Sequence, residues 1–401
     1  MQILLISRCL PYPLHLGDRL IVYHLARELS KRGHEIDLLA FADPARPADH
    51  DLSERAHYEA FFRRITVIDE PRRSPLSLLH RLLDPGARFP RRANHAWSPE
   101  MWQAIEQHRR DHDYDVAHLF GGVQVYEYRH ALGDLPAIIT PYESFTLYLR
   151  RLIEAQPVLS IGGLSLRVQR MIAAAYEGWM FAPYRQTVVL AERDRAELLA
   201  LNPALPVTVI PNGVDLKAFK SHNTDRTEGM LLFTGNFEYA PNIDAALHLA
   251  RDIWPQVRAR VQGVTLWLVG NAPPPELQAL HGGDLYVTGH VPDVSLYLEM
   301  TAAFVCPLRF GAGIKNKVLE ALAMGCPVVA TPLSVDGIDL VDGQHALVVE
   351  DDAFADAIVR LIQDAELQRR LSQQGRELIE TKYNWAQVAE QYERLYRSVS
   401  G

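Results

Sequence analysis

The stretch VCPLRFGAGIKNKVLEALAMGCPVVAT at 305–331 combines residue types that can hold a phosphate group. Gly311 and Gly313 lie between a predicted strand and a predicted helix, where the lack of side chains lets the backbone turn sharply. Because free N–H groups and the positive end of the helix then meet at one point, the loop favours an anion. Lys315 and Lys317 follow in the predicted first helical turn. The helix dipole disfavours cations there, and a diphosphate would compensate them.

Glu320 lies about one helical turn beyond Lys317. A carboxylate repels a phosphate group, but it suits a pair of hydroxyls such as those of a ribose. Only six of the 41 Lys and Arg residues are lysines, so two in this loop are a marked concentration. Two simpler alternatives stay open here: lysines that point to solvent, and a glutamate on a helix surface.

Such a loop needs a strand before it and a helix after it, and this alternation runs along the whole chain. Strands that alternate with helices are typical of right-handed βαβ units and a parallel sheet covered on both faces. We expect strands at 2–7, 34–42, 65–69, 115–120, 137–140, 187–191, 207–210, 230–236, 264–270, 285–291, 302–308, 327–331 and 345–350. A polar stretch at 220–229 and the PNG at 211–213 separate two sets of strands. The sequence therefore predicts an α/β protein with two doubly wound, Rossmann-like domains.

The chain has 401 residues and a net charge of −8. An acidic balance argues against a nucleic-acid partner. The surplus lies in the second half, because residues 1–205 carry 25 basic and 25 acidic side chains. The net charge of the whole chain therefore does not indicate whether a local site binds an anion. Three cysteines without metal spacing, a start unlike a signal peptide and no apolar run of ~18 residues predict a cytoplasmic protein with at most peripheral membrane contact.

An Arg-rich stretch at 63–92 carries eight arginines against three acidic residues. One interpretation is a solvated excursion from the domain. The other is a patch within 60–95 that faces anionic lipid head groups or a lipid-linked diphosphate at the inner face of a membrane.

The stretch at 305–331 resembles the signature of retaining glycosyltransferases of the GT-B fold, in particular glycosyltransferase family 4. That family shows two glutamates eight positions apart, followed by A-(M/L)-A-x-G-x-P-V-V-A, and Glu320 to Ala330 match its second half. Further resemblance covers ELSKRGHEIDLLAF at 28–41, YDVAHLF at 114–120, VIPNGVDLKAF at 209–219 and NWAQVAEQYERLY at 384–396. It implies a domain at 1–205 completed by the helix 384–401, a nucleotide-sugar domain at 206–383, and a central cleft between them.

Two positions depart from the family pattern. The first glutamate of the pair falls on Ala312, which leaves the donor sugar to backbone groups around Ala312 and Gly313. A basic pair near the start of the second domain falls on Asn236 and Asn242. The diphosphate charge must then be neutralised elsewhere, and the cations available are Arg309, Lys315 and Lys317. We interpret this as a Gly-rich-loop subgroup of the family.

The resemblance also implies roles for single residues. His118, expected at the end of a strand, would be the catalytic histidine; a satisfied histidine at a strand end is the alternative. Donor-binding residues would be Gly235, Asn236, Gly289, Val291, Arg309, Gly311, Ala312, Gly313, Lys315, Asn316, Lys317 and Glu320. Acceptor-side residues would be Gly17, Asp18, Tyr142 and Glu143, although Asp18 also suits a helix N-cap.

Other motifs carry less weight. The DHD at 111–113 has the form of a metal-nucleotide motif but precedes a strand, and His108 and His112 lack a third ligand. GxGxxG and GxSxG are absent, which disfavours a nicotinamide dehydrogenase and an α/β-hydrolase. By resemblance we expect neither a metal nor a cofactor.

The resemblance thus predicts a retaining hexosyltransferase. It would move sugar from a nucleotide diphosphate sugar to a hydroxyl of a sugar or lipid-linked acceptor, in cell-surface polysaccharide or glycolipid assembly. A nucleotide-sugar epimerase or phosphorylase of the same fold is one alternative. A non-catalytic homologue that binds nucleotide sugar is another, because Ala312 replaces a carboxylate.

Overall fold

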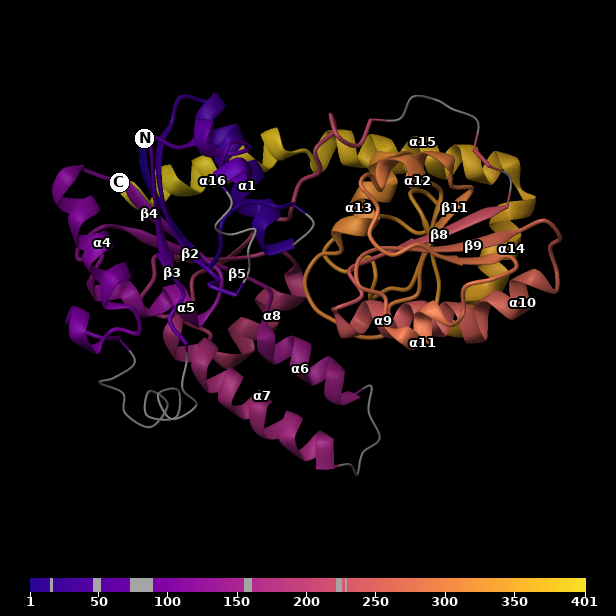
Figure 1. Cartoon of the computed structure of the whole chain (residues 1–401), viewed down its shortest axis with the longest axis horizontal. Coiled ribbons are helices and arrows are strands. Elements are labelled where there is room, and N and C mark those ends of the chain that lie inside the picture. Colours follow the sequence, from indigo (N-terminus) through magenta and orange to yellow (C-terminus); the bar gives the residue numbers. More distant parts are fainter. Residues whose placement is uncertain (15–16, 46–51, 73–88, 155–160, 221–225, 228) are drawn as a thin grey trace. The chain divides into compact units, whose positions relative to one another are not determined.

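The computed structural model describes all residues except 15–16, 46–51, 73–88, 155–160, 221–225 and 228 (Figure 1). Contacts divide the chain into unit 1, Met1–Ile210 with Val388–Gly401, and unit 2, Pro211–Gln387. The division falls five residues after the expected boundary, because the strand Val207–Val209 pairs with the sheet of unit 1. The centre of the Arg-rich stretch, 73–88, lies outside the described residues.

Unit 1 is built on a parallel sheet of seven strands in the order β3-β2-β1-β4-β5-β6-β7. The order reverses between β1 and β4, which is the point where doubly wound sheets hold ligands. The strands are β1 Gln2–Ser7, β2 Glu35–Ala42, β3 Arg64–Asp69, β4 Val116–Phe120, β5 Ala137–Tyr142, β6 Gln186–Val189 and β7 Val207–Val209. Each coincides with a predicted strand.

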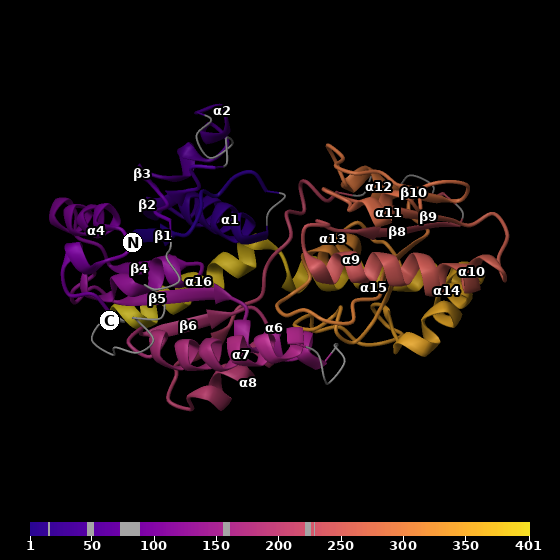
Figure 2. The ribbon, with the colours of Figure 1, turned by 60° about the horizontal axis from the view of Figure 1, so that its bottom comes forward.

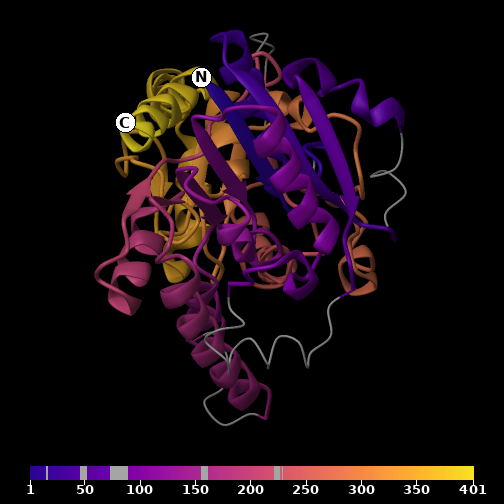
Figure 3. The same ribbon diagram turned by 90° about the vertical axis from the view of Figure 1, so that its left-hand side faces the viewer.

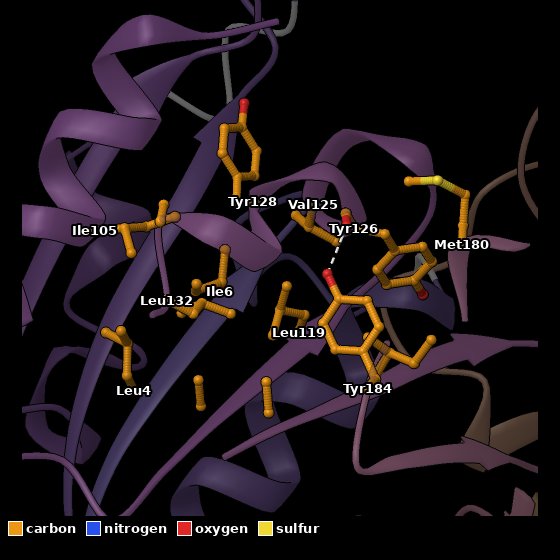
Figure 4. Packing of buried hydrophobic residues seen from close by; sticks show 14 of the residues in the cluster. Leu4, Ile6, Ile105, Leu119, Val125, Tyr126, Tyr128, Leu132, Met180 and Tyr184 are labelled. Carbon is orange, nitrogen blue, oxygen red and sulfur yellow. Dashed lines mark hydrogen bonds between the residues drawn. The ribbon is translucent and has the colours of Figure 1, made fainter. Parts of the chain in front are cut away.

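Helices cover both faces of this sheet. They are α1 Gly17–Lys31, α2 Leu52–Arg55, α4 Pro99–Asp111, α5 Val123–Tyr126, α6 Phe145–Glu154, α7 Ile161–Met180, α8 Glu192–Leu201 and α16 Trp385–Ser400. On one face Leu4 and Ile6 of β1 meet the buried side chains of α4, α5 and the end of α7 (Figure 4). There the Tyr184 hydroxyl donates a hydrogen bond of 2.5 Å to the Tyr126 carbonyl (Figure 4).

Unit 2 repeats the architecture with a parallel sheet of six strands in the order β10-β9-β8-β11-β12-β13. The strands are β8 Met230–Thr234, β9 Thr265–Val269, β10 Leu285–Val287, β11 Ala303–Cys306, β12 Val328–Ala330 and β13 Leu347–Val348. Figure 2 shows β8, β9 and β10 side by side. The order reverses between β8 and β11, so the predicted Gly-rich loop, which follows β11, leaves the sheet at this reversal.

The helices of unit 2 are α9 Ala240–His248, α10 Trp254–Arg258, α11 Pro275–Gln278, α12 Ser295–Met300, α13 Asn316–Ala323, α14 Phe354–Gln363 and α15 Ala365–Lys382. A π-helical turn at Leu249–Ile253 joins α9 to α10. It ends two residues before Pro255, which has no N–H to donate to the preceding turn. The resulting helical run from 240 to 258 occupies the stretch that follows β8.

Candidate functional site

The carboxyl edge of the unit 2 sheet gathers most of the predicted donor-binding residues. The chain leaves β8 at Gly235, and it leaves the neighbouring β11 into the loop that leads to α13. Gly311 and Gly313 have φ values of +125° and +68°, which favour glycine. Both are buried, so the loop is a packed part of the unit.

Three consecutive backbone amides of this loop have no acceptor. Among the residues that the structure describes, the N–H groups of Ala312, Gly313 and Ile314 donate no hydrogen bond. Ala312 is 5% exposed and Ile314 is 8% exposed, so water has little access. Buried amides without a partner are rare, because each costs free energy. Their arrangement is typical of a backbone cradle for an anion.

Lys315 was predicted in the first helical turn, but it lies at the N-cap position of α13, one residue before the helix begins. Its side chain is buried, and the ammonium donates to the Ala312 carbonyl at 2.9 Å and also to the Gly313 carbonyl. These bonds turn two carbonyls of the loop toward the lysine. Lys315 thus holds the loop in shape.

Lys317 is placed differently, although it lies only two residues further on. Its ammonium donates to Asn242 Oδ1 at 2.6 Å and lies 4.4 Å from the centre of the Phe233 ring. A Cβ atom at Gly235 would lie 2.9 Å from this ammonium, so the glycine makes room for it. Burial lowers the pKa of Lys317 to about 8. The cation is enclosed at the β8 edge, and no carboxylate among the described residues accepts a hydrogen bond from it.

Glu320 lies one turn along α13 and is half-buried. Burial raises its pKa to about 7, while the nearby Lys317 acts in the opposite direction. Its carboxylate accepts no hydrogen bond from the described residues, so both oxygens are available to hydroxyl donors. The Glu320 carboxylate, which can accept hydrogen bonds from hydroxyl groups, therefore lies one helical turn from Lys317.

The remaining polar residues of the loop are engaged with the protein. Arg309 forms a two-pronged ion pair with Asp244 of α9, at 2.9 and 2.6 Å. Hydrogen bonding to Asp244 raises the pKa of Arg309, so this cation is already neutralised. Asn316 accepts a hydrogen bond of 2.9 Å from Asn212, which ties the start of α13 to the PNG turn.

Glycines bring the strand ends close together. A Cβ atom at Gly270, the residue after β9, would lie 1.7 Å from the Gly235 carbonyl oxygen. Gly289 accepts a hydrogen bond from the Gly270 amide at 3.2 Å, and Val291 is half-buried beyond it. Asn236 uses its carbonyl to accept the Asn242 amide at 2.8 Å. Sequence reasoning missed Gly270, although a glycine as the last residue of a predicted strand was its signal.

His118 does not fit its predicted place. The expectation that it ends its strand is wrong, because β4 continues to Phe120, and its ring is fully buried. Nδ1 lies 2.6 Å from the Tyr396 hydroxyl of α16, and Nε2 lies 2.7 Å from Thr140 Oγ1. Burial lowers the pKa of His118 well below its usual value. The ring is a neutral link between the sheet and α16, which argues against a catalytic role.

The carboxyl edge of the unit 1 sheet holds the predicted acceptor-side residues. Gly17 and Asp18 form the start of α1, and Tyr142, with φ of +69°, ends β5. The Tyr142 hydroxyl donates to the Asp18 carbonyl at 2.9 Å, so the structure brings these two together. Glu143 follows next in the chain and is half-buried.

Arg8 was missed by sequence reasoning. It follows β1 and forms an ion pair of 3.1 Å with Asp18, while 42% of its side chain stays exposed. A Cβ atom at Gly121, which follows β4, would lie 2.4 Å from Arg8 Cγ. A cation is thus held at the carboxyl ends of the neighbouring strands β1 and β4, where the strand order reverses.

The described residues hold no cluster of three or more His, Cys, Asp and Glu side chains suited to a metal ion. His108 bonds to Tyr114 and Thr66 within unit 1. Across the same part of the chain, no helix combines the length and apolarity needed to span a bilayer.

Comparison with known proteins shows which families this chain matches. Residues 20–218 match the family described as Glycosyltransferase Family 4, and residues 228–364 match the one described as Glycosyl transferases group 1. The phosphatidyl-myo-inositol mannosyltransferase of Mycolicibacterium smegmatis is 29% identical over an alignment of 238 residues that covers 55% of this chain. The match spans 60% of that protein's length, which is less than two thirds.

Two solved structures resemble the fold over nearly the whole chain. Sucrose-phosphate synthase from Thermosynechococcus elongatus covers 99% of this chain and 98% of its own, with a TM-score of 0.70 and 20% identity. HepE of Anabaena, solved in complex with UDP-glucose, covers 99% of both chains with a TM-score of 0.67 and 14% identity. Two parallel-sheet units with these neighbours define a GT-B protein. The chain belongs to glycosyltransferase family 4, among the group 1 glycosyltransferases.

Proposed function

We propose that this protein is a hexosyltransferase that binds a nucleoside diphosphate sugar in unit 2 and transfers the sugar to a hydroxyl acceptor. One observation carries the proposal: the enclosed ammonium of Lys317 belongs to the first turn of α13, and the amides of Ala312 to Ile314, which have no acceptor among the described residues, lie in the loop directly before that helix. A buried cation and free amides are stabilised together by an anion. A diphosphate has enough oxygens to meet both.

The structure supports a role for Lys317 in place of the basic pair that the family usually carries. The family's basic pair falls on Asn236 and Asn242, which carry no charge. Lys317 reaches Asn242 from the other side of the sheet reversal, at 2.6 Å. In the proposal a lysine of α13 supplies the charge that the family usually places at the start of α9.

In this mechanism the loop amides and Lys317 stabilise the charge that grows on the leaving diphosphate. Glu320 accepts hydrogen bonds from the ribose hydroxyls, because its oxygens accept no hydrogen bond from another donor among the described residues. The donor sugar contacts backbone groups near Ala312. We propose that the anomeric configuration is retained and that neither a metal nor a cofactor takes part.

The acceptor side of the proposal lies in unit 1. Arg8, Asp18 and Tyr142 form a linked polar group at the reversal of its sheet. The name of the mycolicibacterial relative describes a sugar acceptor that is a phospholipid. We therefore propose a lipid-linked or sugar acceptor, in glycolipid or cell-surface polysaccharide assembly, with Arg8 beside its anionic group.

A thermal-shift panel of UDP, GDP, ADP and dTDP tests the donor site and identifies the base. A ligand at a hundredfold excess over its Kd stabilises the folded state by about 2.7 kcal/mol. We expect one nucleotide to raise the melting temperature clearly, and a sugar carried on that nucleotide to be turned over. Absence of any shift with all four nucleotides contradicts the proposal. A shift without transfer or hydrolysis favours a non-catalytic binding protein.

A further inference from the structure

The helix α9 meets two cations of unit 2 with two different kinds of side chain. Asp244 forms the two-pronged ion pair with Arg309, at 2.9 and 2.6 Å. Two residues earlier, Asn242 accepts a hydrogen bond of 2.6 Å from the Lys317 ammonium. A carboxylate neutralises its cation, whereas an amide oxygen binds a cation and leaves the charge in place. One cation is therefore neutralised by α9 and the other is held as a charged group.

Asn242 is fixed in one orientation by the protein itself. It is 7% exposed, and its side-chain Nδ2 donates to the Asn236 carbonyl at 2.8 Å. Its backbone amide donates to the Tyr239 carbonyl at 2.9 Å. Rotation of the side-chain amide by 180° would place Nδ2 against the ammonium, and two donors cannot bond to each other. Oδ1 is therefore held toward Lys317.

The space around this contact suits an ammonium group. A Cβ atom at Gly235 would lie 2.9 Å from Lys317 Nζ and 3.0 Å from Asn242 Cγ. The centre of the Phe233 ring lies 4.4 Å from Nζ, and an aromatic face attracts a cation without neutralising it. The other two N–H groups of the ammonium donate to no residue that the structure describes. The ammonium is thus held in place with its charge and two donors available.

A carboxylate at position 242 would suit the protein without a ligand better than an amide. Asn242 is the third residue of α9 and Lys317 is the second residue of α13, so two helix N-termini meet at this contact. Both N-termini and the ammonium favour a negative charge. In unit 1, whose parallel strands lie side by side in Figure 3, a carboxylate does begin a helix, because Asp18 in the first turn of α1 pairs with Arg8. A neutral side chain at 242 therefore gives up stability, as residues of functional sites do.

The other titratable groups near Lys317 leave its charge free. Burial, the largest influence, lowers the pKa of Lys317 to about 8, while Cys306 and Glu320 act to raise it and Lys315 acts to lower it. Burial also raises the pKa of the Cys306 thiol, which therefore stays neutral near pH 7. A carboxylate at 242 would act on Nζ at hydrogen-bond distance, where no described carboxylate lies.

We propose that Asn242 is a positioning residue of the donor site, which holds the Lys317 ammonium at the end of β8 without neutralising it and so leaves its charge for a diphosphate. The inference deepens the proposed function and rests on it, because the anion is the one that the donor site would bind. A carboxylate at 242 would stabilise the empty site and compete with the diphosphate for the ammonium. The amide positions the ammonium and does not compete.

Asn242→Asp tests this inference, because it replaces the amide by a carboxylate of nearly the same shape. Calorimetry measures the binding of UDP, GDP, ADP and dTDP, and of pyrophosphate, which carries the diphosphate charge without a base. We expect the ligands that the wild type binds to bind at least about tenfold more weakly to the variant. The melting temperature of the variant without ligand should rise, since the buried ammonium gains a charged partner.

Gln373→Glu is the matched control for the added charge. Gln373 is exposed in the middle of α15, in the same unit, and the change also adds one carboxylate. This variant should bind each ligand like the wild type, because charges on the surface are screened by solvent and salt.

Carbon-13 NMR of labelled lysine gives a second measurement, which needs no ligand. The chain has only six lysines, so the loss of one signal in Lys317→Ala assigns its ε-carbon. In the wild type this signal should titrate near pH 8. The titration should move to higher pH in Asn242→Asp, and to lower pH in Asn242→Leu, which keeps the branched shape but accepts no hydrogen bond. A residue with a merely structural role would not shift the titration in opposite directions.

Equal affinities of Asn242→Asp and the wild type overturn the inference, and so does an unchanged Lys317 titration in both variants. A lower melting temperature that accompanies the loss of affinity also overturns it, because the loss then follows from a damaged fold. A wild type that binds neither pyrophosphate nor any of the four nucleotides contradicts the proposed function, and the inference with it. If the wild type binds and Lys317→Ala weakens binding but Asn242→Asp does not, the proposed function stands and only the role of Asn242 is wrong.

Discussion

Two helix N-termini at the sheet reversals of this protein are built in opposite ways. In unit 1, α1 carries Asp18 in its first turn, and this carboxylate is paired with Arg8. In unit 2, α13 has no acidic residue in its first turn and carries Lys317 there. A helix N-terminus is stabilised by negative charge. Unit 1 supplies that charge from its own sequence, whereas in the proposed function an anionic ligand supplies it in unit 2.

The difference teaches where to look for a nucleotide site in a protein with two similar sheets. Topology alone marks both carboxyl edges as ligand sites. The electrostatic state of each edge separates them, because only the α13 edge combines an enclosed cation with amides that have no acceptor among the described residues. The comparison therefore predicts unequal responses when single charges are removed.

The largest effect is expected for Lys317→Ala. A hydrogen bond to a charged group contributes about 1.5–3 kcal/mol, so binding of the matching nucleoside diphosphate should weaken about 10- to 100-fold. Isothermal titration calorimetry measures the change. Lys382→Ala is the control, because Lys382 is an exposed lysine of the same unit that pairs with Asp339. Unchanged affinity in Lys317→Ala would remove the main distinction between the two edges.

A rise in pH is expected to have the next largest effect. Since the pKa of Lys317 is lowered to about 8, the ammonium is mostly protonated at pH 7 and mostly neutral at pH 9. Nucleotide affinity should fall about tenfold between these values. Lys317→Ala should not show this fall. A wild-type affinity that stays constant to pH 9 would mean that another cation meets the diphosphate.

Glu320→Gln should weaken nucleotide binding by about fivefold. The change keeps the shape of the side chain but replaces a charged acceptor by a neutral one, which costs about 1 kcal/mol. The pKa of Glu320 is raised to about 7, so the wild-type advantage should shrink as the pH falls below 7. Comparing affinities for UDP and for pyrophosphate tests the assignment to the ribose. An equal loss for pyrophosphate would contradict it.

Asp18→Asn should have the smallest effect on nucleotide binding, within about twofold, because Asp18 belongs to unit 1 and the proposed donor site is built from residues of unit 2. The variant removes a partly exposed ion pair with Arg8, which contributes about 0.5–1 kcal/mol to the free energy of unfolding. Urea denaturation measures that loss, and calorimetry measures the affinity. A large loss of nucleotide affinity would show that the α1 edge also meets the donor.

Much of the fold could be predicted from the sequence. All thirteen strands form where short apolar runs were expected, because parallel strands are buried on both faces and their runs are nearly unbroken. The Gly-rich loop was also predictable, since two glycines between a strand and a pair of lysines favour a sharp turn that can hold an anion. The boundary between the units was harder to predict, because β7 is a short strand and the local sequence does not show which of the two sheets it joins.

The roles of single side chains depended on distant partners. Lys315 and Lys317 have the same residue type and nearly the same position, but one is bonded to its own loop and the other to Asn242, 75 residues away. His118 is bonded to Tyr396, which is 278 residues away. A local sequence pattern does not show a hydrogen-bond partner that lies so far away in the sequence.

The last helix, α16, has a consequence for the synthesis of the protein. Its residues from Val388 onward belong to unit 1, where Tyr396 holds His118 and Tyr392 is fully buried. The ribosome makes the seven strands of unit 1 first, but it makes the helix that completes their core only after all of unit 2. The domain begun first is thus finished after unit 2. Until then its sheet depends on protection from premature contacts, and a truncation of only 14 residues would damage the opposite half of the sequence.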